Sequence, residues 1–159
     1  MYEILENFAK KLPKFPDGRI DYRNSDEAAV LSIFVMFRGE FLLLKRSDRV
    51  GNYRGRWNVV AGYFDELKSV GEKALEELEE ETGVNADQVS KLKAFPYFKL
   101  VDEEIDRIFY VFPILVLLNE KPDVKLDWEH TEFKWIDPKE LKKFDVVYGL
   151  QDVLDSFKS

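Results

Sequence analysis

The first third of the chain contains one helical and one strand-like hydrophobic pattern. Residues 1–12 carry apolar side chains at helical spacing, which predicts an amphipathic helix. The prolines and the glycine within residues 13–18 end this helix in a loop. Residues 29–37 and 41–46 are apolar runs of strand length, and the short turn at 38–40 between them predicts a β-hairpin.

The middle of the chain combines a polar loop, a short strand and a strongly acidic helix. Residues 47–57 are polar, and residues 57–64 are predicted to form a short strand. The acidic helix is expected to run from about Ser69 to Thr82. Ser69 is the expected N-cap, and Gly83 is suited to the left-handed conformation that ends many helices.

The last part of the chain resumes the strand-like pattern. Residues 91–101 and 107–118 are predicted as two apolar strands, with residues 102–106 as the hairpin loop between them. The remaining predicted elements are a short strand and two short helices, at residues 131–136, 137–144 and 148–157.

Strands and helices thus alternate irregularly, and hairpins are mixed with crossover connections. This order predicts an α/β fold in which a mixed β-sheet is sandwiched between helices. The length suits a single domain over residues 1–159. We expect an N-terminal helix and loop at 1–25, a core at 29–136 and C-terminal helices at 138–159.

Composition narrows the functional classes. An apolar share of 45% and an aromatic share of 14% indicate a packed globule rather than a disordered chain. No run of about 18 apolar residues occurs, so we expect no membrane span. The formal charge of −7 makes nucleic acid an unlikely partner, although local charge can still bind a small anion. The chain has no cysteine, which excludes disulfides and fits a cytoplasmic location.

The acidic helix gathers carboxylates along one edge. At about 100° per residue, Glu77 and Glu81 border the apolar stripe, Glu80 lies beside them and Glu79 faces solvent. Two carboxylates about 4 Å apart repel by up to roughly 4 kcal/mol in an effective dielectric of about 20. Clustered hard oxygen ligands suit Mg²⁺ or Mn²⁺. The alternative is a solvated acidic face, which is the usual meaning of a charge run.

Gly62 and the segment Glu77–Val84 resemble the Nudix box. That signature is Gly, five residues, Glu, seven residues, then Arg-Glu-apolar-any-Glu-Glu-any-Gly-apolar. The spacing from Gly62 to Gly83 matches it, and "FLLLKRS", "GRWNVVAGY" and "EHTEFKWI" resemble the flanking strands. The resemblance covers roughly residues 29–136.

Two box positions depart from the family. Lys68 stands where the family has Glu, and Glu76 stands where it has Arg. The two changes are opposite in sign, which predicts a reversed ion pair that still ties the loop to the helix. The alternative is independent drift in a non-catalytic protein. Neighbouring Asp65, Glu66 or Glu72 could also supply a carboxylate, although none has the family's spacing.

The resemblance implies hydrolysis of a diphosphate linked to another moiety, often in a nucleoside diphosphate derivative. By that resemblance Glu77, Glu80 and Glu81 would be catalytic and would hold one or more Mg²⁺ or Mn²⁺ ions, with a carbonyl of Ala61 or Gly62 as a further ligand. The metal would neutralise and orient the diphosphate and lower the pKa of the attacking water. The alternatives are a catalytically impaired Nudix-fold nucleotide-binding or regulatory module, and an acidic interaction protein without a nucleotide site.

Residues outside the box would bind the substrate, a small phosphorylated compound. Arginine forks bind phosphate oxygens, so Arg46, Arg54 and Arg56 are candidates, of which one or two would act. The aromatic candidates for stacking on a base are Tyr53, Tyr63, Phe98 and Trp57, the last of which fits the core better. The candidates for a general base outside the box are Glu103, Glu104, Glu129 and Glu132. The single histidine, His130, fits a structural role better than a catalytic one. A homodimer is compatible with the sequence.

Overall fold

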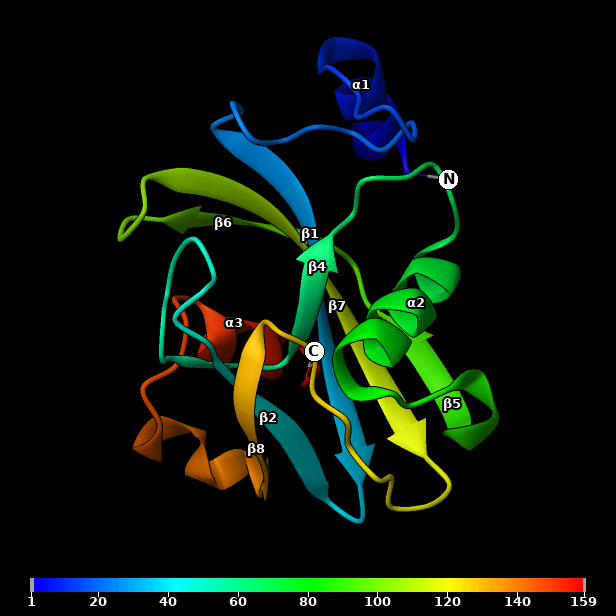
Figure 1. Cartoon of the computed structure of the whole chain (residues 1–159), viewed down its shortest axis with the longest axis vertical. Helices are drawn as coiled ribbons and strands as arrows, with labels where there is room; N and C mark the ends of the chain where they lie inside the picture. The colour runs from blue at the N-terminus through cyan, green and yellow to red at the C-terminus, as the bar shows by residue number, and fades with distance from the viewer. Residues whose placement is uncertain (1, 159) are drawn as a thin grey trace.

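The computed structural model describes residues 2–158, which form a mixed eight-stranded sheet with helices on both faces (Figure 1). The elements in chain order are α1 (Glu3–Lys11), β1 (Glu27–Phe37), β2 (Glu40–Arg46), β3 (Trp57–Asn58), β4 (Val60–Tyr63), α2 (Val70–Thr82), η1 (Ala86–Gln88), β5 (Val89–Ala94), β6 (Phe98–Asp102), β7 (Arg107–Leu118), β8 (His130–Ile136), η2 (Pro138–Lys143) and α3 (Leu150–Ser156). Within the described residues, no helix is long and apolar enough to cross a membrane.

The centre of the sheet is a parallel pair, β1 and β7, in register from Glu27↔Ile108 to Met36↔Leu117. All other pairs are antiparallel: β1 also pairs with β2 and β4, β2 with β3 and β8, and β7 with β5 and β6. Strands buried on both faces are apolar along their whole length, and this explains why β1 and β7 read as continuous apolar runs.

The two faces of the sheet bury separate hydrophobic clusters. On one face, Leu5 of α1 and Leu78 of α2 pack with inward residues of β1 such as Ile33. On the other face, Leu150 of α3 packs with Phe34, the next residue along β1. Figure 1 shows α2 and α3 on opposite sides of the sheet. The predicted sandwich of a mixed sheet between helices is confirmed.

Three local predictions need correction. The strand predicted over residues 91–101 is two strands, β5 and β6, because Pro96 has no N–H for a sheet ladder. Both pair with β7, on either side of Pro113. The strand predicted over 57–64 is also split, into β3 and β4, where the Val59 N–H bonds the Asn58 side chain at 2.8 Å. The short helix after Asp137 is a 3₁₀ helix.

The N-terminal segment packs against the chain just after β4. The buried hydroxyl of Tyr22 donates to the carbonyl of Phe64 at 2.8 Å. The backbone N–H of Ile20 donates to the carbonyl of Asp65, also at 2.8 Å. The loop that leads from β4 into α2 is therefore held on its outer side by residues that precede β1.

Candidate active site

The acidic helix α2 has the caps that its sequence predicts. The Ser69 side chain accepts a hydrogen bond from the Glu72 N–H at 3.2 Å, which satisfies one free donor of the first turn. Gly83 ends the helix in the left-handed conformation at φ +75°, and its N–H bonds the Glu79 carbonyl. These caps fix the residues at which α2 begins and ends, and therefore the side of the helix on which each carboxylate lies.

Gly62 is required by space rather than by its backbone conformation. A Cβ at this position would lie 2.5 Å from both Cδ and Oε2 of Glu77. The Glu77 carboxylate therefore rests directly on the backbone of β4. This close approach explains the glycine that precedes the acidic helix, and it brings a carboxylate of α2 to the peptide of Ala61 and Gly62.

The carboxylates of α2 lie as the helical pattern predicts. The side chain of Glu77 is 13% exposed, whereas Glu81 is buried and receives a 3.4 Å hydrogen bond from the Ala61 N–H. Glu80 is exposed at the edge of the cleft, and Glu79 is exposed without lining it. The structure thus brings Glu77, Glu80 and Glu81 to one side of α2, beside Ala61 and Gly62.

Two residues far along the chain complete the acidic cluster. Ligand atoms of Glu81, Glu129 and His130 all lie within 4.8 Å of one another. The register of β2 with β8 pairs His130 with Arg46, so the start of β8 reaches the end of β2 beside α2. Of the four suggested general bases, Glu129 alone lines the cleft. Glu104 forms an ion pair with Arg56, and Glu132 forms one with Lys45. Glu103 is exposed.

His130 is buried and oriented by a carboxylate. Its Nδ1 lies 2.8 Å from Asp127, and its Nε2 faces Glu81 at 3.7 Å. Burial lowers the pKa of His130, so the neutral ring is favoured. If Nδ1–H donates to Asp127, the Nε2 lone pair points into the acidic cluster. His130 is therefore buried and held by Asp127, and it also lies beside Glu81 in the acidic cluster.

The carboxylates resist joint ionisation. Burial raises the pKa of Glu77 to about 7, and the charge of Glu80 adds to this rise while Lys73 opposes it. Burial also raises the pKa of Glu81 well above its ordinary value, with the charges of Glu77 and Glu129 acting in the same direction. A divalent cation among these oxygens would relieve both the desolvation and the mutual repulsion.

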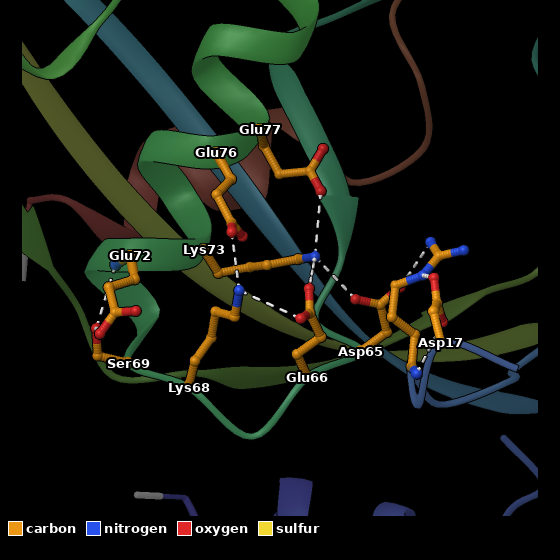
Figure 2. Close-up of polar contacts among 10 residues, drawn as sticks. Asp17, Asp65, Glu66, Lys68, Ser69, Glu72, Lys73, Glu76 and Glu77 are labelled. Carbon is orange, nitrogen blue, oxygen red and sulfur yellow. Dashed lines mark hydrogen bonds and ion pairs between the residues drawn. The ribbon is translucent and has the colours of Figure 1, made fainter. Parts of the chain in front are cut away.

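The two residues that depart from the Nudix signature form an ion pair, as predicted. Lys68 Nζ lies 2.8 Å from Glu76 Oε1 and 3.2 Å from Glu66 Oε2. Figure 2 shows Lys68 reaching from the loop toward the second turn of α2. The charges are reversed relative to the family, but the loop and the helix are still joined at these positions.

A nearly buried lysine joins the same loop to the site. Lys73 Nζ lies 2.9 Å from both Asp65 Oδ1 and Glu66 Oε1, and 3.7 Å from Glu77 Oε1 (Figure 2). Burial acts to lower the pKa of Lys73, but the hydrogen bonds to Asp65 and Glu66 outweigh it and raise the pKa. Lys73 therefore stays charged and holds three carboxylates around the entry of α2.

A cleft of about 400 Å³ runs along this cluster. Its lining includes acidic and polar side chains, namely Asp65, Glu77, Glu80, Asp102, Glu129, Asn52 and Asn58. The lining also includes apolar side chains from β6, β7 and the region of α3: Leu100, Phe109, Val111, Val147, Leu150 and Val153. The cleft can accept a molecule with one charged and one apolar part.

The structure separates the three arginines proposed for substrate binding. Arg46 lines the cleft, with its guanidinium bonded to the Asn52 carbonyl at 3.0 Å. Arg54 bonds the Val50 carbonyl, and Arg56 pairs with Glu104; neither residue lines the cleft.

The aromatic candidates also divide. Tyr53 and Tyr63 line the cleft. Trp57 is buried in the core as expected, and it packs edge-on against Phe144. Phe98 packs against the core cluster on the α3 face instead of lining this cleft.

The fold and the site together define an α/β protein that gathers carboxylates along one wall of a ligand-sized cleft. A family model described as the NUDIX domain matches residues 25–157. The chain therefore belongs to the Nudix family, and its enzyme class is that of the Nudix pyrophosphohydrolases. The box that carries this relationship has Lys68 and Glu76 in place of the family's Glu and Arg.

Individual proteins are similar at lower identity. The nucleoside triphosphatase NudI of Escherichia coli O81 (strain ED1a) is 23% identical over 124 residues, which cover 73% of this chain and 86% of the relative. The MutT protein from Methanosarcina mazei Go1 superposes with a TM-score of 0.65 at 23% identity, over 83% of this chain and 93% of that one. An Ap4A hydrolase from C. elegans gives a TM-score of 0.61 at 26% identity, over 83% and 94%.

Proposed function

We propose that this protein is a divalent-metal-dependent hydrolase of a diphosphate linkage in a nucleotide, such as a nucleoside diphosphate joined to another moiety. The observation that carries the proposal is the seating of Glu77 against Gly62. It gathers acidic oxygens at a cleft that is also lined by apolar side chains. The names of two relatives, a nucleoside triphosphatase and an Ap4A hydrolase, support a nucleotide as the substrate class.

The donor set fits Mg²⁺ or Mn²⁺. Glu77, Glu80 and Glu81 would hold the metal, and the peptide at Ala61 and Gly62 lies beside them. Glu129 and His130 offer further ligand atoms at the Glu81 end. When bound, the ion would supply charge neutralisation and Lewis acidity toward the diphosphate. Burial, together with the charges of neighbouring carboxylates, raises the pKa values of Glu77 and Glu81, and a cation bound among these oxygens would offset both effects.

The chain's own groups divide the remaining work. Arg46, which lines the cleft with Glu129, would bind a phosphate oxygen of the substrate. Glu129 lines the cleft, and burial raises its pKa, with Asp127 adding to the rise, so this carboxylate is the candidate general base outside the box. The apolar residues of the cleft would hold the base or another flat moiety and exclude water from it, and Tyr53 and Tyr63 are the candidates for stacking.

A hydrolysis screen tests this function. Nucleoside triphosphates, ADP-ribose, dinucleoside polyphosphates and nucleotide sugars are incubated with the protein, with and without Mg²⁺ or Mn²⁺. We expect metal-dependent release of a nucleoside monophosphate or a phosphorylated moiety. The double variant Glu80→Gln with Glu81→Gln should lose it, whereas the matched control Glu79→Gln, on the exposed side of the same helix, should retain it.

The same variants test metal binding without turnover. Mg²⁺ or Mn²⁺ should raise the melting temperature of the wild type and of Glu79→Gln, since a ligand of the folded state stabilises it. The double variant should show no rise. An equal rise in the double variant contradicts the metal assignment. A wild-type protein that binds metal but turns over no compound, even at high enzyme and Mn²⁺, contradicts the hydrolase proposal and favours the binding module.

A further inference from the structure

A residue outside the region matched by the NUDIX domain reaches the cleft. The match begins at residue 25, whereas Arg19 lies in the loop between α1 and β1 and lines the cleft with Asp65 and Glu77. Among the described residues, Arg19 and Arg46 are the cationic side chains that line this cleft.

The loop holds the Arg19 guanidinium in a defined orientation. Gly18 is at φ +92° and its N–H bonds the Phe15 carbonyl, while the Phe15 N–H bonds the Arg19 carbonyl at 2.8 Å. Asp17 accepts bonds from the backbone N–H of Arg19 at 3.1 Å and from its Nε at 2.8 Å. The guanidinium also lies over the Phe15 ring at 5.0 Å. Two contacts, with Asp17 and with the Phe15 ring, therefore restrain this side chain, although it is 44% exposed.

The terminal nitrogens of Arg19 remain available. Arg19 Nη1 lies 3.6 Å from Asp65 Oδ2, which is an ion-pair distance but too long for a hydrogen bond. Asp65 is already neutralised by Lys73 at 2.9 Å. Within residues 2–158, the Nη groups of Arg19 make no hydrogen bond, so their donors are free for a ligand in the cleft.

The two arginines approach the carboxylates from different elements. Arg46 is the last residue of β2. In the sheet it lies opposite His130 of β8, next to Glu129. Arg19 contacts Asp65 at the entry of α2, on the side of Glu77. A diphosphate bound between these groups would carry negative oxygens that a guanidinium fork could bind directly.

We propose that Arg19 binds a phosphate oxygen of the substrate diphosphate, so that the N-terminal loop is a functional part of the active site. This inference rests on the proposed function. It goes beyond that function by assigning phosphate recognition to a segment outside the matched domain. Arg19 and Arg46 would then hold the diphosphate from two sides.

The test compares two arginines that share one environment. Arg23 also lies over the Phe15 ring, at 4.8 Å, and it pairs with Asp21 at 2.7 Å, but it does not line the cleft. Binding of inorganic diphosphate in the presence of Mg²⁺ is measured by calorimetry for the wild type, Arg19→Gln, Arg19→Lys and Arg23→Gln. Arg19→Gln should weaken binding about tenfold or more, as expected for loss of a charge-assisted hydrogen bond.

The other variants should behave differently. Arg19→Lys should lie between wild type and Arg19→Gln because it keeps the charge but not the fork. Arg23→Gln should match the wild type. The rise in melting temperature with Mg²⁺ should be the same in all four proteins, since no metal ligand is changed. With a hydrolysed substrate, Arg19→Gln should raise KM by a similar factor and leave kcat nearly unchanged.

Several outcomes would overturn the inference: equal diphosphate binding in Arg19→Gln and wild type, an equal loss in Arg23→Gln, or no binding by the wild type. An equal loss would mean that the loop acts only through folding. If wild-type protein binds diphosphate through Arg19 but hydrolyses nothing, the inference stands and the proposed function fails. The two proposals can therefore fail separately.

Discussion

Lys68 and Glu76 lie 2.8 Å apart, across the junction between the loop after β4 and the second turn of α2. Each has the charge opposite to that of the family's residue at the same position, so the pair is reversed but intact. Lys68 also contacts Glu66 at 3.2 Å. Glu66 in turn pairs with Lys73, whose ammonium reaches Glu77 (Figure 2). The reversed pair is thus the outer end of an ion-pair chain that leads to Glu77 in the candidate active site.

Exchanging the two charges should recover what each single change loses. Lys68→Glu places a carboxylate beside Glu66 and Glu76, and Glu76→Arg places two cations together. Glu76 is 45% exposed, so each loss in the free energy of unfolding should be about 1 kcal/mol or less. The double variant restores an attractive pair between positions 68 and 76, and urea unfolding of all four proteins measures the coupling.

The recovery in the double variant should be incomplete. Lys68 is shared with Glu66, and the exchange leaves a new carboxylate next to Glu66. Lys68→Met serves as the control because it removes both contacts without adding a like charge. Strictly additive losses would show that positions 68 and 76 are uncoupled and that the altered box is simple drift.

Gly62→Ala should disable the metal site without unfolding the protein. The new methyl group would lie 2.5 Å from the Glu77 carboxylate, which must then move away from β4. We expect the rise in melting temperature with Mg²⁺ or Mn²⁺ to be lost or strongly reduced. Gly51→Ala is the matched control, because its methyl group would meet no atom within 4 Å. An unchanged metal response in Gly62→Ala would mean that Glu77 needs no contact with β4.

Much of the fold could be predicted because the spacing of apolar residues along the chain indicates which side chains are buried. The apolar runs of β1 and β7 and the caps of α2 were predicted within one or two residues. The break between β5 and β6 was missed because the apolar pattern continues through Pro96, although the missing N–H of proline was a signal for it. The pairing of β1 with β7 is a long-range contact, and no local pattern encodes its register.

The site was predictable where its residues are close in sequence. Glu77, Glu80 and Glu81 follow from one helix and one motif. The approach of Glu129 and His130 depends on the pairing of β8 with β2, and Arg19 depends on the path of the N-terminal loop. Residue type alone could not separate Arg46 from Arg54 and Arg56, because only the structure shows which of the three side chains lines the cleft.

Lys73→Met should destabilise the protein strongly. The lysine side chain is 7% exposed and lies 2.9 Å from Asp65 and 3.7 Å from Glu77, so its removal takes the nearest cation away from two nearly buried carboxylates. Breaking a buried pair from one side typically costs about 3–5 kcal/mol, and we expect about 3 kcal/mol from urea unfolding at pH 7. The control Lys91→Met, at an exposed position in β5, should change stability by less than about 0.5 kcal/mol. Similar losses in both variants would contradict this role of Lys73.

The stability of the metal-free protein should depend on pH through Glu77. Its pKa is about 7 in the folded protein against an ordinary value of 4.5, so the fold favours the protonated form. The stability that protonation contributes is present below about pH 4.5 and is lost as the pH rises through 7. His130, whose pKa is lowered by burial, acts in the opposite direction, since stability falls as the pH drops below its ordinary value of 6.5.

Glu77→Gln isolates this contribution, because the amide resembles the protonated carboxyl and does not titrate. Without metal, the free energy of unfolding of Glu77→Gln minus that of the wild type should grow between pH 5 and pH 8. With Mn²⁺ the wild type should gain more stability at pH 8 than at pH 5.5, since a ligand carboxylate must lose its proton to bind the metal. The variant should gain less than the wild type at pH 8. A difference that stays constant from pH 5 to pH 8 would show that Glu77 is already ionised at pH 5 and that the cluster is better solvated than its burial indicates.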